Sequence, residues 1–282
     1  MITKQNGIYT LTLSLLLFSL QIKAATDYQT YETVCGEPTD MFSFVDRGGI
    51  AINPCVVPPK NILVGVGYQY QQLIGGGIQN NFPSSVIEVG LPDYFEVDLT
   101  LPSYINQTIA PRIGYTATQL DLKRILWFNS KWITSVNGTV IFPSGSSSFG
   151  SKGPGGGVTA ILAYNINDQI NLTGTLEYLS ISEPINSGGQ SFTSVNPDLL
   201  LSWTKNKISL FIEVYGQSKT APDEGSGYNA DAGILYLIKK ILSSIWRLIN
   251  VLVVFWMVLS VIMVEELLYN LINADLLYAK PA

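Results

Sequence analysis

The sequence predicts an all-β protein that folds as an up-and-down antiparallel transmembrane β-barrel. Its segments alternate apolar and polar side chains with the period of two that a strand requires. Several segments reach the roughly nine to eleven residues with which a tilted strand crosses a hydrocarbon layer. Short and long connections also follow one another in strict alternation. That order is typical of a meander with tight turns at one rim and long loops at the other.

Composition narrows the function classes before any motif is considered. The 282 residues carry 16 Lys plus Arg against 21 Asp plus Glu, a formal charge of −5. Such an acidic, sparsely charged chain has no electrostatic footprint for nucleic acid. Because the sequence contains no His, Ser-His-Asp catalysis and His-metal chemistry are excluded. We therefore expect no enzyme, no cofactor and no metal site.

The N-terminal 24 residues have the pattern of a secretory signal peptide. Lys4 precedes an apolar run from Ile8 to Leu20, and small residues follow at Ala24 and Ala25. Charge, a short apolar core and small residues are the marks of a segment that is cleaved during export, here after Ala24. The mature protein is thus expected outside the cytoplasm.

Residues 25–60 form an N-terminal extension that contains both cysteines, Cys35 and Cys55. An exported protein can oxidise such a pair, and the bridge would close a loop of about 20 residues, worth roughly 3 kcal/mol on the chain-entropy model. The spacing is not CxxC, so a structural disulfide is favoured over a reactive pair.

The barrel itself is expected over residues 61–240, where alternation marks ten strands. In the segment "DQINLTGTLEYL", Ile170, Leu172, Leu176 and Tyr178 share one face of the ribbon. The apolar face would point inward in a soluble sandwich and outward in a membrane barrel, and the connections favour the barrel. The ten expected strands are 61–71, 85–91, 94–101, 109–120, 128–142, 158–165, 169–182, 195–203, 207–217 and 228–239.

The connections are expected to form two classes. Tight turns are predicted at 92–93, 123–125, 166–167 and 204–206. Long loops rich in Gly, Ser, Pro and Asn are predicted at 72–84, 102–108, 143–157, 183–194 and 218–227. The glycine-rich loop 145–157 lacks the Gly-Lys-Ser/Thr order of a phosphate-binding loop, so it is interpreted as a flexible rim loop.

Residues on the opposite parity, most of them polar, are the candidates for lining a lumen. Acidic members would favour cations if they lay in a pore, or they could pair with Arg112 or Lys131. The candidates are Glu88, Glu96, Asp98, Asn171, Thr173, Thr175, Glu177, Ser209, Phe211, Glu213, Tyr215, Asn229 and Asp231.

The segment "GTVIFPSGSSSFGSKGPGGGVTAILAYNIND" contains a strand that ends in a Pro-Ser-Gly loop, followed by a glycine-bearing strand. Together with "NPDLLLSW" and "YNADAGILYLI", it resembles the outer-membrane transporter-like family named after the meta-pathway of phenol degradation. The likeness covers roughly residues 60 to 240. It implies an outer-membrane barrel that passes hydrophobic or aromatic compounds, and it supplies no catalytic residues.

The tail, residues 241–282, does not fit that family. Leu248 to Val264 is an uncharged stretch of 17 residues, near the lower limit for a membrane-spanning helix, so the tail is expected to be helical. A reading-frame slip near Lys240 is favoured over this helix, and a buried or interfacial helix is the remaining alternative. The slipped frame would supply two more alternating strands, which brings ten to the even number of twelve that single-chain bacterial barrels require.

These patterns predict an outer-membrane channel for small solutes, with membrane lipid as its surroundings. The resemblance implies that the solutes are hydrophobic or aromatic. The alternative is an exported β-sandwich that binds ligands and is tethered by a C-terminal transmembrane helix. Heat-modifiable migration would favour the barrel, and inner-membrane fractionation would favour the sandwich.

Overall fold

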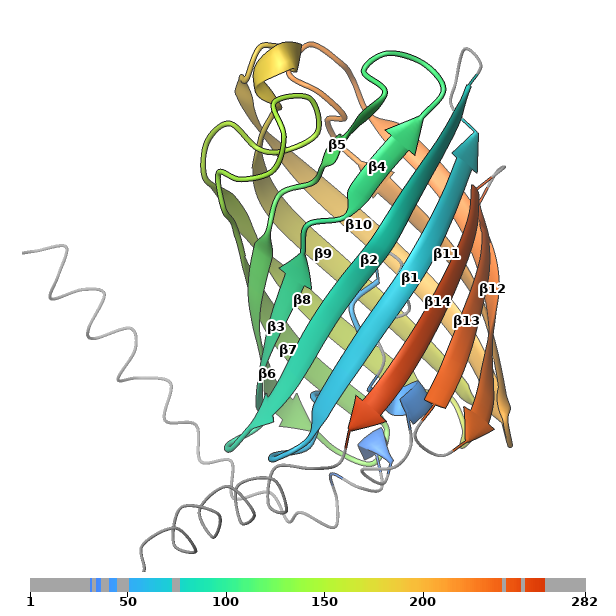
Figure 1. Ribbon diagram of the computed structural model, residues 1–282. Coiled ribbons are helices and arrows are strands. Elements are labelled where there is room, and N and C mark those ends of the chain that lie inside the picture. The colour runs from blue at the N-terminus through green and yellow to red at the C-terminus, as the bar shows by residue number, and fades with distance from the viewer. Residues whose placement is uncertain are drawn as a thin grey trace, which may run out of the picture.

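The computed structural model describes residues 31, 34–36, 41–44, 51–72, 77–239, 242–249 and 252–261. The expected signal peptide, residues 1–24, lies outside them. The described residues form one antiparallel sheet of fourteen strands with two short 3₁₀ turns, η1 (Met41–Ser43) and η2 (Ile185–Ser187) (Figure 1). None of the helices in the described part of the chain has the length and apolar character needed to cross a membrane.

Neighbouring strands follow chain order almost throughout, so the sheet is a meander. The strands are β1 (Ile62–Gln72), β2 (Ile78–Leu91), β3 (Phe95–Leu101), β4 (Tyr104–Gln107), β5 (Ile113–Tyr115), β6 (Gln119–Phe128), β7 (Trp132–Ile141), β8 (Gly155–Asn165), β9 (Ile170–Ser182), β10 (Ser191–Lys205), β11 (Ile208–Gln217), β12 (Gly227–Lys239), β13 (Leu242–Ile249) and β14 (Leu252–Val261).

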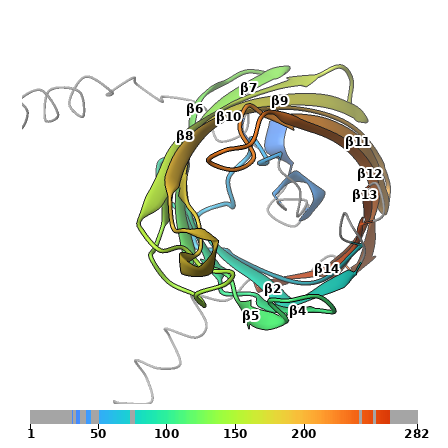
Figure 2. The same cartoon turned by 90° about the horizontal axis from the view of Figure 1, so that it is seen from above.

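The fourteen strands occupy twelve positions in the sheet. Both β3 and β4 pair with β2, so they continue one line of chain that Pro102 and Ser103 interrupt. In the same way β5 pairs with β4, and β6 pairs with β3. At the two ends of this series, β1 pairs with β2 along one edge and with β14 along the other. The sheet curves around a central space (Figure 2). This space holds the described residues that precede β1, namely 31, 34–36, 41–44 and 51–61, which are called the N-terminal segment below.

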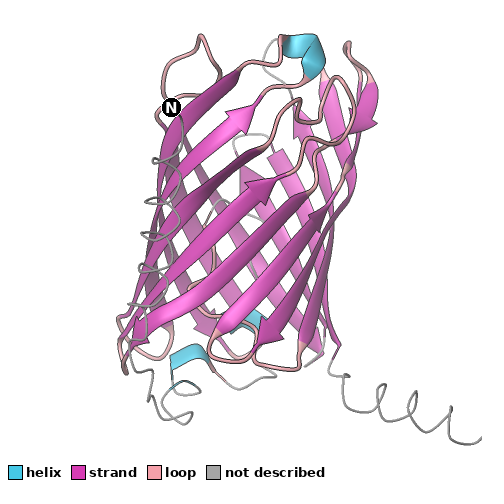
Figure 3. Cartoon of the chain, turned by 90° about the vertical axis from the view of Figure 1, so that its left-hand side faces the viewer, coloured by secondary structure: helices cyan, strands magenta, loops and turns pink. Residues whose placement is uncertain are grey.

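Short turns and long loops separate to opposite ends of the strands (Figure 3). The expected turns at 92–93 and 166–167 fall between paired strands, as predicted. The turn expected at 204–206 is displaced to 206–207, because Thr204 and Lys205 still pair with β11. Asn167 closes its turn by accepting hydrogen bonds from the backbone of Gln169 and Ile170, each at 2.9 Å. An Asx turn of this kind fixes a tight connection through the side chain of its first residue.

The turn predicted at 123–125 is wrong, because these residues lie within β6. Two adjacent basic residues suggest a solvated bend, but each has its own partner in the sheet. Lys123 points inward to Glu96, and Arg124 stacks on the ring of Phe95 at 4.5 Å. The true turn is 129–131, where the Asn129 side chain accepts the backbone N–H groups of Lys131 and Trp132.

That error displaced the neighbouring elements. The strand expected over 109–120 is replaced by β5 and the first residues of β6, and the strand expected over 128–142 begins at Trp132. The loop expected over 72–84 is also too long, since β2 starts at Ile78 and runs for 14 residues.

The helical tail is wrong where the structure describes it. Residues 242–249 and 252–261 are β13 and β14, which extend the sheet beyond the expected boundary at 240. An uninterrupted apolar run carries no period that separates helix from strand. Pairing decides instead, because these two strands satisfy the backbone groups along the edges of β12 and β1. The frame-slip hypothesis was meant to account for two further strands. In the structure, β13 and β14 of the given sequence take the place of those strands. Residues 262–282 lie outside the described part.

Candidate functional site

The wall of the sheet has one apolar face and one polar face, and the polar face is turned inward. On β9, Thr173 and Thr175 are 3% and 7% exposed, whereas Leu176 and Tyr178 are 53% and 57% exposed. The same inversion recurs on β11, where Ser209 and Glu213 are buried and Ile212 is exposed. A soluble protein would bury the apolar set. This sheet exposes it around the perimeter.

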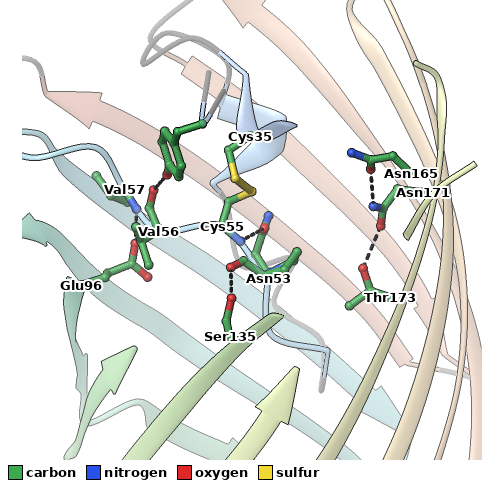
Figure 4. Close-up of a disulfide and its surroundings, with 12 residues drawn as sticks. Cys35, Asn53, Cys55, Val56, Val57, Glu96, Ser135, Asn165, Asn171 and Thr173 are labelled. Atoms are coloured by element: carbon green, nitrogen blue, oxygen red, sulfur yellow. Dashed lines mark hydrogen bonds between the residues drawn. A yellow bond between two sulfur atoms is a disulfide. The ribbon is translucent and has the colours of Figure 1, made fainter. Parts of the chain in front are cut away.

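The N-terminal segment lies inside the curve of the sheet and packs against apolar side chains of the wall (Figures 2 and 4). The expected disulfide is present between Cys35 and Cys55. Its surroundings are a single cluster of buried apolar side chains from the segment and the wall. The cluster contains Tyr31, Cys35, Phe42, Phe44, Ala51, Cys55, Val56 and Val57 from the segment, with Leu63, Ile125, Phe128, Ile133, Ala163, Leu200, Phe211 and Leu235 from the strands.

Hydrogen bonds fix this segment to side chains of the wall. The backbone N–H of Ala51 donates to Oε1 of Glu213 at 2.7 Å, and the N–H of Val57 donates to the carboxylate of Glu96. The hydroxyl of Ser135 donates to the carbonyl of Pro54. Within the segment, the Tyr31 hydroxyl donates to the Val56 carbonyl at 2.5 Å. Charged acceptors make such bonds stronger than neutral ones.

Glu96 also forms a buried ion pair with Lys123, whose Nζ lies 2.5 Å from Oε1 of Glu96. The pair begins a row of polar residues in which each is the register partner of the next. The row crosses β3, β6, β7, β8, β9 and β10 through Glu96, Lys123, Asn137, Thr159, Glu177 and Asn196.

Neutral donors hold the carboxylates of this region in place. Asp121 accepts hydrogen bonds from Asn137, Thr139 and Gln119 at 3.0, 2.5 and 2.8 Å. Glu177 accepts one from the amide of Asn196 at 2.7 Å. Asp121 and Glu177 are thus hydrogen-bonded to neutral side chains rather than isolated charges.

A cavity of about 510 Å³ lies between the N-terminal segment and the ends of the strands next to the short turns. Ten of its lining residues carry an amide or hydroxyl group, and the segment contributes apolar groups around the disulfide (Figure 4). The polar lining residues are Ser43, Asn53, Ser130, Asn165, Asn167, Gln169, Asn171, Thr173, Ser202 and Thr204.

The structure places most of the sequence-predicted residues on the buried side of the wall. Glu88, Glu96, Asp98, Thr173, Thr175, Ser209, Phe211 and Glu213 are buried, and Asn171, Glu177 and Tyr215 are half-buried. Asn229 is exposed, because it lies close to the start of β12 beside a long loop. Asp231 is the register partner of Glu213.

Sequence reasoning missed Asp121, Lys123, Asn137 and Asn196. Asp121 and Lys123 were missed because the turn was misplaced. Asn137 was considered only as part of the Asn137-Gly138-Thr139 stretch, which matches a glycosylation sequon by chance. Sequence reasoning also missed the position of the extension, for which no local signal exists. Among the described residues, no group of three or more His, Cys, Asp or Glu side chains could hold a metal ion.

Comparison with solved structures identifies the fold. The chain is similar to an outer-membrane channel from Pseudomonas putida F1, with 11% identity and a TM-score of 0.60 over 77% of this chain and 100% of that one. It is more distantly similar to the NanC porin, with 10% identity and a TM-score of 0.46 over 71% and 97% of the two chains. A comparison with curated protein sequences finds no match.

A family model matches residues 77–248, which is more than half of the chain. The matched region begins just before β2 and ends within β13, so it includes most of the wall. The chain therefore belongs to the family described as "Putative MetA-pathway of phenol degradation".

Proposed function

We propose that this protein is a channel of the bacterial outer membrane, formed by a closed barrel of twelve strand positions, that admits small solutes. The observation that carries the proposal is the inverted wall, with apolar side chains such as Leu176 around the outside and threonines and carboxylates inside. Hydrocarbon tails would cover the outer face. The pairing of β1 with both β2 and β14 supports closure, which would leave the barrel without a free edge.

The thirteen polar-face residues named from the sequence would line the lumen or its rims. Their side of the wall faces the N-terminal segment, which already occupies part of the interior through Ala51 and Val57. The proposed path is therefore narrow and runs beside the segment rather than through an empty cylinder. We assign the short-turn rim to the periplasm and the long-loop rim to the outside, as in bacterial barrels generally.

A tethered β-sandwich fits less well. Two packed sheets would bury Leu176, Tyr178 and Ile212 between them, and these side chains are exposed. We also assign the protein a passive role rather than a catalytic one, since the sequence contains no His. The family resemblance implies that the solutes are hydrophobic or aromatic.

The proposal is tested by refolding the full-length protein into a planar bilayer and recording its conductance in sodium chloride. Discrete single-channel steps, together with heat-modifiable migration on a gel, are the expected result. A heat-modifiable protein that gives no steps, even with the disulfide reduced, would contradict a channel. A protein that fractionates with the inner membrane would contradict the assigned location.

A further inference from the structure

The cavity between the N-terminal segment and strands β8 to β10 has a lining that selects a ligand by its chemistry. We propose that it is a binding subsite for an uncharged, ring-shaped solute with several hydroxyl groups, such as a monosaccharide or a cyclic polyol. This inference rests on the proposed channel function, because the solute would reach the cavity along the lumen. Its volume of about 510 Å³ falls within the roughly 300 to 1,000 Å³ of ordinary small-molecule sites.

The strand side of the cavity presents a directional chain of hydrogen bonds. The Thr173 hydroxyl donates to Oδ1 of Asn171 at 2.7 Å, and Nδ2 of Asn171 donates to Oδ1 of Asn165 at 2.7 Å. The amide nitrogen of Asn165 has no hydrogen-bond acceptor within the described part of the chain, and one N–H of Asn171 is likewise left over. The chain thus ends in donors that border the cavity (Figure 4).

Amide groups both donate and accept hydrogen bonds, and hydroxyl groups of a solute do the same. A solute with several hydroxyls can therefore satisfy the leftover N–H groups of Asn165 and Asn171 and also donate to their carbonyl oxygens. A purely hydrocarbon solute would strip water from these amides and return no hydrogen bond, which costs binding free energy. The lining on this side consequently disfavours an aromatic hydrocarbon.

The charge of the lining also narrows the class. Among the described lining residues, Asp168 is the one with an ionisable side chain, and it is exposed on the turn after β8. Selection of an anion or a cation would require a buried counter-charge within the cavity. The described lining has amides in that place, which suit a neutral ligand.

The apolar part of the lining comes from the N-terminal segment and from β7, the neighbour of β8, while Ser43 and Asn53 of the segment are polar. Phe42 and Ile133 are 4% and 2% exposed, and Cys55 lies beside them in its disulfide. A linear polyol offers hydroxyls in every direction, whereas a compact ring presents C–H groups on its faces and hydroxyls on its edge. A ring can therefore pack against Phe42 and Ile133 while its hydroxyls face Asn165 and Asn171.

The test measures solute entry into liposomes that contain the full-length protein, using glucose, its anionic relative gluconate, its cationic relative glucosamine, and phenol. Glucose should enter faster than either charged relative, and phenol should not slow it. At low concentration, where entry reflects occupancy of the subsite, Asn171→Leu should slow glucose entry by about fivefold, the effect of one net hydrogen bond. The matched control is Asn186→Leu, which removes an exposed amide of η2 bonded to Ser148 at 2.7 Å and should leave entry unchanged.

Sodium chloride conductance separates this inference from the channel itself. If wild type conducts ions but Asn171→Leu and Asn165→Ala admit glucose at the wild-type rate, the subsite is wrong and the channel stands. Faster entry of gluconate or glucosamine than of glucose, or competition by phenol, would also overturn the subsite. Absence of conductance in every protein would remove the channel on which it rests. Heat-modifiable migration shows whether each variant is folded. If Asn171→Leu does not fold, the entry of glucose is compared in Asn165→Ala instead.

Discussion

The ammonium of Lys123 lies 2.5 Å from a carboxylate oxygen of Glu96, and both side chains are completely buried. Glu96 also accepts the backbone N–H of Val57, so one carboxylate links two wall strands to the N-terminal segment. Lys123 is the basic member of a register row whose other members carry carboxylate, amide or hydroxyl groups. The pair therefore contributes both to the stability of the wall and to the position of the segment.

Removing one member of this pair should destabilise the protein strongly. Lys123→Met leaves Glu96 buried without its counter-charge, and loss of one partner of a buried ion pair costs about 3 to 5 kcal/mol. The double variant Lys123→Met/Glu96→Gln should recover much of the loss, since no unpaired charge remains. Urea unfolding in liposomes measures both, with Lys152→Gln in a long loop as the control. Equal loss in the single and double variants would contradict the coupling.

The disulfide should control how firmly the segment occupies the lumen. Breaking the bridge in Cys35→Ser/Cys55→Ser frees a loop of about 20 residues, worth roughly 3 kcal/mol by chain entropy, so the segment leaves its place more often. Single-channel conductance should then rise or flicker between levels. Reduced wild type should reproduce this behaviour, and a reductant should not change the double variant. Identical traces with and without the bridge would show that the segment does not limit the path.

The outward face should tolerate apolar but not charged substitutions. Leu162 on β8 is 48% exposed, and a lipid-facing arginine costs about 2 to 4 kcal/mol at the midplane of the bilayer. We therefore expect Leu162→Arg to lower the urea midpoint of the liposome-embedded protein, while Leu162→Phe has little effect. Ser148→Arg in a long loop is the matched control for the added charge. Equal stability of Leu162→Arg and wild type would mean that lipid does not touch this position.

The pairing of β14 with β1 should be detectable by cross-linking. Val64 and Leu259 are register partners, and directly opposite residues of antiparallel strands lie about 4.5 to 5.5 Å apart at Cα, which suits a disulfide. In the Cys35→Ser/Cys55→Ser background, Val64→Cys/Leu259→Cys should oxidise readily. The mismatched pair Val64→Cys/Leu252→Cys should not, because Leu252 is opposite Gln71. Bridging of both pairs, or of neither, would argue against this register.

Much of the wall could be predicted from the sequence, and the errors have a common cause. The local period of two predicts on which face of the sheet residues such as Leu176 and Thr175 lie. The alternating connection lengths distinguished a barrel from a sandwich. Lys123 and Arg124 misled the prediction because their partners, Glu96 and Phe95, lie on another strand. Adjacent charged residues in a sequence suggest a solvent-exposed turn. A charged side chain that has a partner on a neighbouring strand can instead lie within a strand of the wall.

The sequence by itself determined the faces of the strands, the order of short and long connections and the availability of one disulfide. These properties depend on neighbours along the chain. Tertiary structure decided that residues 242–261 add two strands and that the N-terminal segment sits inside the sheet. The physical reason is that both depend on partners far away in sequence: the bond from Ala51 to Glu213 joins residues 162 positions apart, and β14 pairs with β1 from the opposite end of the sheet.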